Sequence, residues 1–411
     1  MHSQNKQVSP GTGLIIACSA LIAGNLVGAG ILGLPINTGL AGLGPSMLAM
    51  IAGGAMMFLT AVILGEQSAK GRNETFDYPS LYETFLGRFG KWAAIIANMI
   101  ILYGLLTAYF TGGAKIVASL AGIEGQATLV TLFFAMPLIV LTCINLSIIQ
   151  RLNTFLVIFL AGTFILLVAL SSGHVELSRA NYSDWFFLPA TLPIIVTAFH
   201  FHNIIPTVST QLNWDMKAFK KAVLLGMFMA FIMNSLWVLV GIGVVPLTGE
   251  NSILAAWHTN TPATIPMGVI IANPVFIIMG SVFALVAIST SFLANGLGLQ
   301  GFLRDLLYNT FGINNRVMVI FATFTPPLLT ALVYPDIFLK ALDIVGGVGI
   351  VILFGILPTL IVILDKAHST KMRIICSLAL VFAGAILLME IFQEIGMLRL
   401  HPWADIHASG N

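Results

Sequence analysis

The sequence has few charged side chains and few cysteines, and each shortage excludes a class of protein. Asp, Glu, Lys and Arg make up only 8% of the 411 residues, whereas soluble domains carry about 25%. The net charge is +2 and the basic residues are dispersed, so no nucleic-acid partner is expected. Cys18, Cys143 and Cys376 lie in apolar segments without disulfide context or metal-ligand spacing. We therefore expect no disulfide framework, no metal site and no cofactor.

Apolar sequence is what the chain has in abundance. Hydrophobic residues make up 58% of it and the mean hydropathy is +0.98, which predicts a polytopic membrane protein embedded in a lipid bilayer. The sequence does not determine the number of subunits. Eleven segments are long and apolar enough to span: residues 12–37, 40–68, 91–118, 127–147, 153–172, 188–212, 220–245, 269–299, 316–334, 337–364 and 372–395.

The distribution of Lys and Arg predicts how these spans are oriented. With the N-terminus inside, most of the 18 basic residues fall on the inner side of the membrane, as the positive-inside rule requires. Residues 1–11 then form a cytoplasmic tail. Because the number of spans is odd, residues 396–411 form an external tail.

Glycines interrupt the first span near its middle. Gly24, Gly28, Gly30 and Gly33 precede Pro35, and each glycine costs roughly 1 kcal/mol in a helix relative to alanine. Unwound backbone at membrane depth is tolerated only where it faces protein or a water-filled cavity. There it exposes N–H groups for a carboxylate and C=O groups for a cation. This break indicates a secondary transporter.

The four residues at this break are expected to bind the carboxylate of a substrate through their N–H groups. The alternative is close helix packing, because Gly24 and Gly28 also have the spacing of a helix-contact motif. The four residues are Val27, Gly28, Ala29 and Gly30.

A second interruption falls in the sixth span, where two histidines and Asn203 precede Pro206. Spans 1–5 (residues 12–172) and spans 6–10 (residues 188–364) have opposite topology, and each group begins with a broken span. Interrupted segments at matching positions of two inverted halves are a sequence signal for a transporter site. Span 11, residues 372–395, lies outside the repeat.

Both broken segments resemble known transporter motifs. Residues 24–35 resemble the first-helix signature of the amino acid/polyamine/organocation superfamily. Residues 199–206 resemble the sixth-helix motif of the hydroxy and aromatic amino acid permeases, usually Phe-Gly-Phe-His-Gly-Ser-Ile-Pro. In this chain His200 and Asn203 stand in place of the two glycines, and Ile204 in place of serine. Bacterial tyrosine and tryptophan permeases belong to that family.

The resemblance implies an all-α membrane protein of the bacterial inner membrane. Its fold is then a LeuT-type five-plus-five inverted repeat with an eleventh transmembrane helix. The implied activity is ion-driven uptake of an amino acid, bound between spans 1, 3, 6 and 8. None of the interrupted segments carries Asp or Glu, which favours a neutral, aromatic or hydroxylated amino acid as the small-molecule substrate.

Side chains of the third and sixth spans are expected to line the substrate site. Phe199, Phe201 and His202, with Asn203 beside them, form its wall and gate in this prediction. The alternative is lipid-facing aromatics and a histidine bonded to a neighbouring helix; a histidine at this depth is by default a functional hypothesis. His200 would face nearly the opposite way on an intact helix.

In the third span, Tyr103 is nearer the middle and is the predicted site residue. Asn98 and Tyr109 could also face the cavity. The alternative is an interfacial aromatic residue, and this alternative suits Tyr109 best.

The sequence is compatible with coupling to protons, with coupling to sodium, and with exchange that needs no driving ion. Proton symport is the first prediction, because the similar permeases are proton-driven and His202 can titrate near neutral pH. The sodium alternative uses Asn25 and the hydroxyls of Ser289, Thr290 and Ser291. These hydroxyls would otherwise bond to carbonyls of their own helix. The sequence shows no catalytic cluster of an enzyme and no like-residue ring of a channel.

Three further carboxylates are assigned structural partners. Glu66 is expected to pair with a basic group at the inner interface. Asp343 follows Lys340 at i+3, so an ordinary ion pair is predicted. Glu390 in span 11 is expected to pair with a neighbour near the outer face.

Overall fold

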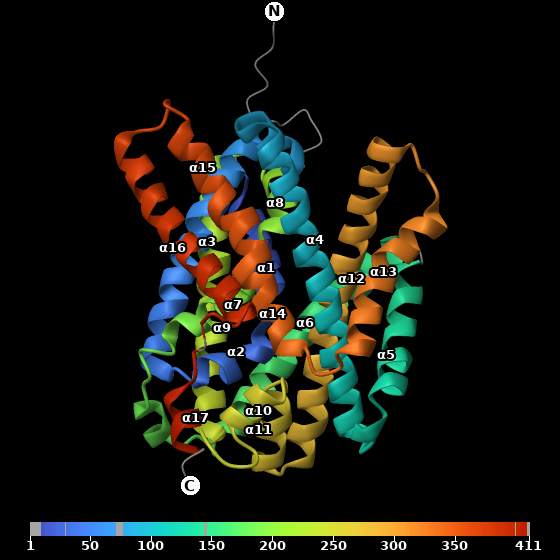
Figure 1. The fold of residues 1–411 in the computed structure, drawn as a ribbon, viewed down its shortest axis with the longest axis vertical. Helices are drawn as coiled ribbons and strands as arrows, with labels where there is room; N and C mark the ends of the chain where they lie inside the picture. The colour runs from blue at the N-terminus through green and yellow to red at the C-terminus, as the bar shows by residue number, and fades with distance from the viewer. Residues whose placement is uncertain (1–9, 29, 71–76, 144–145, 399, 409–411) are drawn as a thin grey trace, which may run out of the picture.

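The chain folds almost entirely into helices (Figure 1). The structure, a computed structural model, describes residues 10–28, 30–70, 77–143, 146–398 and 400–408. In these residues no strand forms, and one isolated antiparallel bridge joins Gly42 and Ser183. The α-helices are α1 Thr12–Leu26, α2 Gly30–Gly39, α3 Leu43–Lys70, α4 Tyr78–Ala121, α5 Ala127–Thr142, α6 Leu146–Ser172, α7 Leu188–Ala198, α8 Ile205–Gln211, α9 Met216–Val244, α10 Ile253–His258, α11 Thr264–Ile271, α12 Pro274–Phe311, α13 Arg316–Val333, α14 Phe338–Ile344, α15 Leu357–Leu364, α16 Thr370–Glu394 and α17 Trp403–Ala408. A π-helix, η4 (Val345–Ile356), joins α14 to α15.

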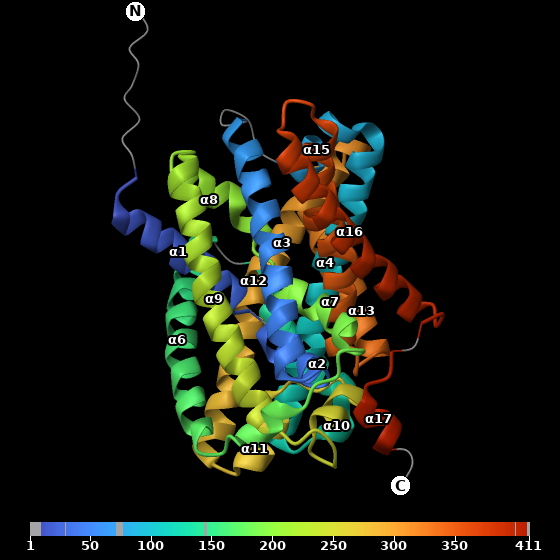
Figure 2. The same ribbon diagram turned by 90° about the vertical axis from the view of Figure 1, so that its left-hand side faces the viewer.

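Within the described residues, eight helical segments are long and apolar enough to cross a membrane. The pair α1 and α2 passes the same test when taken together, with a bend of 58° between its halves. Ala127–Thr142 and Ile158–Ser172 are shorter apolar helices. The predicted all-α membrane fold is confirmed. The helices α8 and α15 lie toward one end of the molecule and α17 lies at the other (Figures 1 and 2).

The first span breaks directly after Leu26. Val27 leaves the helical region (φ −92°, ψ 56°), and its N–H still bonds to the Ala23 carbonyl. The helix restarts as α2 at Gly30, where a Cβ would lie 3.2 Å from the Cα of Ala198. The absence of a side chain at Gly30 therefore permits the close approach of α2 to the end of α7. Figure 2 shows α1 leaning away from the bundle toward the N-terminus.

The sixth span breaks between α7 and α8. The residues after Ala198 leave the α-helix, and a short 3₁₀ turn, His202–Ile204, leads into α8. Pro206 stands in the first turn of α8, where the missing N–H of proline breaks no intrahelical bond. Both spans that the sequence predicts to be interrupted are interrupted.

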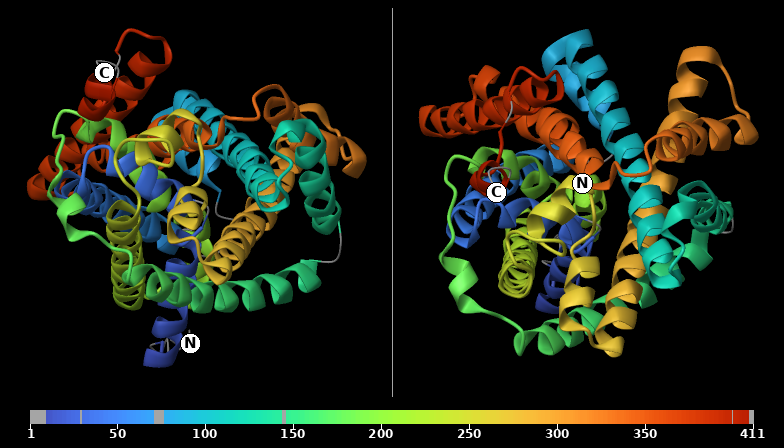
Figure 3. Two further views of the ribbon diagram at one scale, coloured as in Figure 1. Left: turned by 90° about the horizontal axis from the view of Figure 1, so that it is seen from below. Right: turned by 60° about the horizontal axis from the view of Figure 1, so that its bottom comes forward.

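The half-helices occupy the middle of the bundle. α2 packs against α7 and α9, and η4 packs against α7 and α16. Seen from below in Figure 3, α16 lies at one edge and α5 at the opposite edge. Trp237 of α9 lies 5.9 Å from Phe164 and 5.8 Å from Phe283, measured between ring centroids, which ties α6, α9 and α12 together.

The eighth span differs from its predicted bounds of residues 269–299. α11 ends at Ile271, Ala272 adopts a left-handed conformation, and Asn273 caps the new helix by accepting from the Val275 N–H at 2.9 Å. Pro274 then opens α12, which continues to Phe311. The Asn-Pro pair is a helix-start signal that an apolar run obscured.

Span 10 packs against α7 through a glycine. A Cβ on Gly346 would overlap the carbonyl oxygen of Pro193. Close by, the Thr197 hydroxyl donates to the Leu342 carbonyl at 2.9 Å. The first half-helix of span 6 is thereby held directly against span 10.

We expect Gly346→Ala to lower the free energy of unfolding by about 1–3 kcal/mol, the usual cost of overpacking a filled interior. Gly384→Ala is the matched control, because nothing lies within 4 Å of a Cβ at that position. Thermal melting of the detergent-solubilised protein, followed by tryptophan fluorescence, compares the two. Equal melting temperatures for both variants would contradict the contact between span 10 and α7.

Candidate functional site

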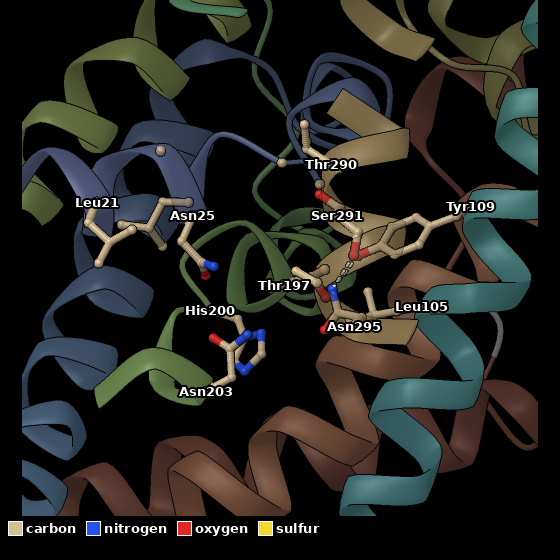
Figure 4. Close-up of a pocket in the computed structure, with 15 residues that line it drawn as sticks. Leu21, Asn25, Leu105, Tyr109, Thr197, His200, Asn203, Thr290, Ser291 and Asn295 are labelled. Atoms are coloured by element: carbon tan, nitrogen blue, oxygen red, sulfur yellow. Dashed lines mark hydrogen bonds between the residues drawn. The ribbon is translucent and has the colours of Figure 1, made fainter. Parts of the chain in front are cut away.

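A cavity of about 120 Å³ lies where the two broken spans meet (Figure 4). The end of α1, the start of α2, α4, α12 and the unwound part of span 6 all contribute to its lining. Figure 4 shows Asn25, His200 and Asn203 on one side, facing Tyr109, Ser291 and Asn295. Further lining residues are Leu21, Gly24, Leu26, Gly28, Gly30, Leu105, Thr197, Thr290 and Ala294.

The glycines of span 1 bring the backbone to the cavity. A Cβ on Gly28 would lie 2.8 Å from the Ser291 hydroxyl oxygen, so only a bare backbone leaves this space open. The Gly28 N–H makes no hydrogen bond with the described part of the chain. Gly30 opens α2, and a helix N-terminus presents N–H groups that have no intrahelical partner.

Of the four residues predicted to bind a carboxylate, only Gly28 and Gly30 line the cavity. Val27 is 3% exposed, and its N–H is already bonded to the Ala23 carbonyl at 3.0 Å. Val27 is therefore not available as a donor in this geometry. Ala29 lies outside the described residues.

Span 6 presents different side chains to the cavity from those predicted. His200 and Asn203 line it, whereas Phe199, Phe201 and His202 do not. The predicted arrangement assumed helical geometry, but the chain is unwound at Phe199 and Phe201. Unwinding changes the direction of successive side chains, so His200 turns inward and its neighbours turn away.

The three buried residues of this segment pack against the scaffold. The Phe199 ring lies over Gly54 of α3 and 6.4 Å from the Phe231 ring. Phe201 is 1% exposed, and its ring centroid lies 5.0 Å from that of His202. The geometry gives both phenylalanines a packing position and no contact with the cavity.

His202 has the environment that the alternative interpretation describes. Its Nε2 lies 3.0 Å from the Thr60 hydroxyl, and its ring stacks on Phe354 at 4.9 Å. The Tyr78 hydroxyl donates to its backbone carbonyl. His202 is fully buried and links span 6 to α3, α4 and η4.

Of the two tyrosines of span 3 that could face the cavity, Tyr109 does and Tyr103 does not. The Tyr103 hydroxyl donates to the Ala322 carbonyl of α13 at 2.7 Å, outside the cavity. Tyr109 lines the cavity and is 3% exposed, so it is not interfacial. Its hydroxyl accepts from the Asn295 amide at 3.2 Å (Figure 4). Distance from the span's middle was a poor guide because α4 crosses the bundle at a tilt.

Two of the three hydroxyl residues predicted in span 8 reach the cavity. Thr290 and Ser291 line it, and Ser289 does not. The Thr290 hydroxyl donates to the Ala287 carbonyl at 3.1 Å, which is the ordinary bond within a membrane helix. Asn25, the remaining predicted ion ligand, lines the cavity from the last turn of α1.

The cavity is polar and carries no acidic side chain among its described lining residues. The N-terminus of α2 gives it a partial positive charge, and the C-termini of α1 and α7 give it partial negative charges. This arrangement matches the opposite charges of a zwitterion.

The carboxylates outside the cavity follow the predictions only in part. Glu66 pairs with Lys220 at 2.8 Å, as predicted. The predicted pair of Asp343 and Lys340 is wrong, because Lys340 pairs with Glu394 at 3.0 Å. Asp343 instead accepts hydrogen bonds from Asn37. The i+3 rule considered one helix and missed a partner more distant in sequence.

We expect Gly28→Val to abolish amino acid uptake without lowering the amount of protein in the membrane. The valine side chain would displace the Ser291 hydroxyl and fill the approach to the backbone. Gly298→Val is the control, since a Cβ there meets nothing within 4 Å. Normal uptake by Gly28→Val in proteoliposomes would place the binding site elsewhere.

Solved structures support the fold. A manganese transporter of Eremococcus coleocola superposes with a TM-score of 0.63 over 97% of this chain and 92% of that chain, at 13% identity. Such a likeness concerns the fold alone, and the chain has the predicted LeuT-type architecture.

Sequence relatives are more specific. Tyrosine-specific transport system 1 of Haemophilus influenzae is 26% identical over 80% of this chain and 83% of that protein. A tryptophan-specific transport protein of Pseudomonas aeruginosa is 25% identical over 81% and 82%. Glutamine transporter 2 of Aliivibrio fischeri is 23% identical over 87% and 91%. The profile of the Tryptophan/tyrosine permease family matches residues 12–395, and the chain belongs to this family of multi-pass membrane transporters.

Proposed function

We propose that the protein imports a neutral amino acid across the bacterial inner membrane by proton symport with alternating access. The observation that carries this proposal is the polar cavity at the meeting point of two broken spans. The substrate carboxylate is assigned to the N–H groups at Gly28 and Gly30. Its ammonium group is assigned to the carbonyl ends of α1 and α7.

An aromatic amino acid is the first candidate substrate. Relatives over most of the chain's length are named for tyrosine and tryptophan. Tyrosine suits this cavity in particular, because its ring could contact Leu105 while its hydroxyl meets a polar lining group. The absence of Asp and Glu from the described lining argues against a cationic substrate.

A smaller hydroxylated or amide side chain is the second candidate. His200 and Asn203 occupy positions that are glycine in the usual family motif, and both side chains line the cavity (Figure 4). They reduce the space for an aromatic ring and add hydrogen-bonding groups. A relative named as a glutamine transporter belongs to the same set of similar proteins.

The coupling ion is proposed to be the proton, with the N-terminus on the cytoplasmic side and the C-terminus outside. Sodium remains the alternative, through Asn25 with the hydroxyls of Thr290 and Ser291. Of these two hydroxyls, that of Thr290 donates to the Ala287 carbonyl of its own helix. Ser289 is removed from the sodium alternative by its position outside the cavity.

Separately imposed proton and sodium gradients distinguish proton symport from sodium symport. Purified protein in proteoliposomes should accumulate labelled amino acid under an inward proton gradient without sodium. Under a sodium gradient at equal pH, with the membrane potential clamped, no accumulation is expected. If accumulation occurs under a sodium gradient alone and is lost in Thr290→Ala, the coupling ion is sodium and not the proton. If accumulation is driven by neither ion, the protein is an exchanger.

We expect His200→Gly and Asn203→Gly to shift selectivity toward larger aromatic amino acids, since each removes a side chain from the cavity. Competition by a panel of unlabelled amino acids against labelled tyrosine measures the shift, with the alanine variants giving intermediate values. Unchanged relative inhibition by tryptophan, serine and glutamine in both glycine variants would show that these side chains do not set the substrate.

A further inference from the structure

A second cavity, of about 350 Å³, lies toward the C-terminal end of the molecule and contains unpaired acidic groups. The ends of α2, α14 and α16 border it, together with α10. It is separate from the substrate cavity, since the described linings share no residue. The charged residues that line it are Lys340, Asp343, Glu390 and Glu394, with the titratable His258 and His401.

Asp343 is held by an asparagine from the first span. The Asn37 amide nitrogen donates to both carboxylate oxygens of Asp343, at 3.0 and 2.9 Å. Asn37 is 2% exposed, and its amide oxygen has no hydrogen-bond partner in the described part of the chain. These two donated bonds fix the position of the Asp343 carboxyl group between α2 and α14.

Glu390 has no such partner. It is 3% exposed and lines the cavity, yet its carboxyl group forms no hydrogen bond or ion pair with the described residues. Its side chain lies against Gly347 of η4, where a Cβ would be 2.7 Å from the Glu390 Cγ. The charge of Glu390 acts on the neighbouring Asp343. An ionised carboxylate buried in this way is costly unless a cation neutralises it.

The other charges around the cavity are already paired. Lys340 is bonded to Glu394 at 3.0 Å. His258 and His401 both face Asp405, at 3.1 and 3.4 Å. The helices α2 and α7 and the π-helix η4, which pack around this region, contribute no Asp, Glu, Lys, Arg or His of their own to the lining. In the described part of the chain neither Asp343 nor Glu390 forms an ion pair, and Lys340 acts on Glu390 only from beyond ion-pair distance.

We propose that Glu390 is the carboxyl group that binds the transported proton, beside an Asp343 whose carboxyl group is hydrogen-bonded to Asn37. This inference rests on the proposed proton symport and assigns the site of the proton. A proton suits these groups better than a metal ion does. Asn37 presents N–H donors to Asp343, whereas a metal requires oxygen ligands. No group of three or more metal-ligating His, Cys, Asp or Glu side chains occurs in the described residues.

The proton site and the substrate cavity are connected by short stretches of packed structure. Asn37 lies roughly 10 Å along α2 from Gly30, at 1.5 Å per residue. The second connection runs through Thr197, which lines the substrate cavity and donates to the carbonyl of Leu342, the residue before Asp343. Protonation at Glu390 changes the charge that faces α2 and α14, and both elements contact the half-helices of the substrate site.

The test compares driven accumulation with exchange in proteoliposomes. The probe is the labelled amino acid that the wild type takes up fastest. Wild type should accumulate it under an inward proton gradient, and a pH-sensitive dye inside the vesicles should report acidification. Glu390→Gln should lose both accumulation and acidification while still exchanging labelled for unlabelled amino acid at equal pH. Glu390→Asp, which keeps a carboxyl group, should retain part of the accumulation.

Asp336→Asn is the matched control, because Asp336 is also a carboxylate near the outer end, paired with Lys115 at 2.7 Å. It should accumulate like the wild type. Wild-type accumulation in Glu390→Gln would overturn the assignment of Glu390 and leave proton symport standing. If Glu390→Gln and Glu390→Asp lose exchange equally, Glu390 has a structural role that depends on its size. That result would also overturn the assignment of Glu390. A wild type that no proton gradient drives would overturn the proposed symport itself.

Discussion

The requirement that backbone polar groups find partners inside a bilayer governs the whole centre of this molecule. The chain leaves helical geometry after Leu26 and again after Ala198. Neither break would be stable facing lipid. They are brought together because Gly30 allows the start of α2 to approach Ala198 closely, so each break is enclosed by the other and by α4 and α12. The cavity is the space left between the two enclosed breaks. It is polar in part because interrupted helices leave backbone N–H and C=O groups without helical partners.

The sequence-based predictions succeeded where a feature depends on residues close together in the sequence. The breaks at residues 24–30 and 199–206 could be predicted because glycine and proline act on their own backbone. That Glu66 would pair with a basic group could be predicted because an interfacial carboxylate needs a cation, but its partner Lys220 could not be named from the sequence. Which side chains face the cavity was not predictable, because unwinding at Phe199 removes the helical period on which that prediction rested. The bond from Asn37 to Asp343 joins two inverted halves, and no local pattern indicates it.

Span 10 packs between α7 of the sixth span and α16 of the eleventh span. Its glycines let it lie against the Pro193 carbonyl of α7 on one side and against Glu390 of α16 on the other. The wide π-helical stretch η4 occurs at these same glycines, and such segments are frequent at functional sites. Span 11 lies outside the inverted repeat, yet it supplies a buried carboxyl group to the second cavity. The last span is thus placed to contribute chemistry as well as packing.

In the sixth-span motif, the residues that match the family pattern are different from the residues that line the cavity. The residues that match the usual pattern, Phe199, Phe201 and His202, are buried against α3, α9 and η4. Of the three residues that depart from it, His200 and Asn203 line the cavity and Ile204 does not. Packing against several helices restricts a side chain strongly, because a change in volume disturbs every neighbour. A side chain beside a cavity has fewer such neighbours. The motif positions that match the family are therefore packing positions, and the proposed choice of amino acid is assigned to the cavity-lining positions His200 and Asn203.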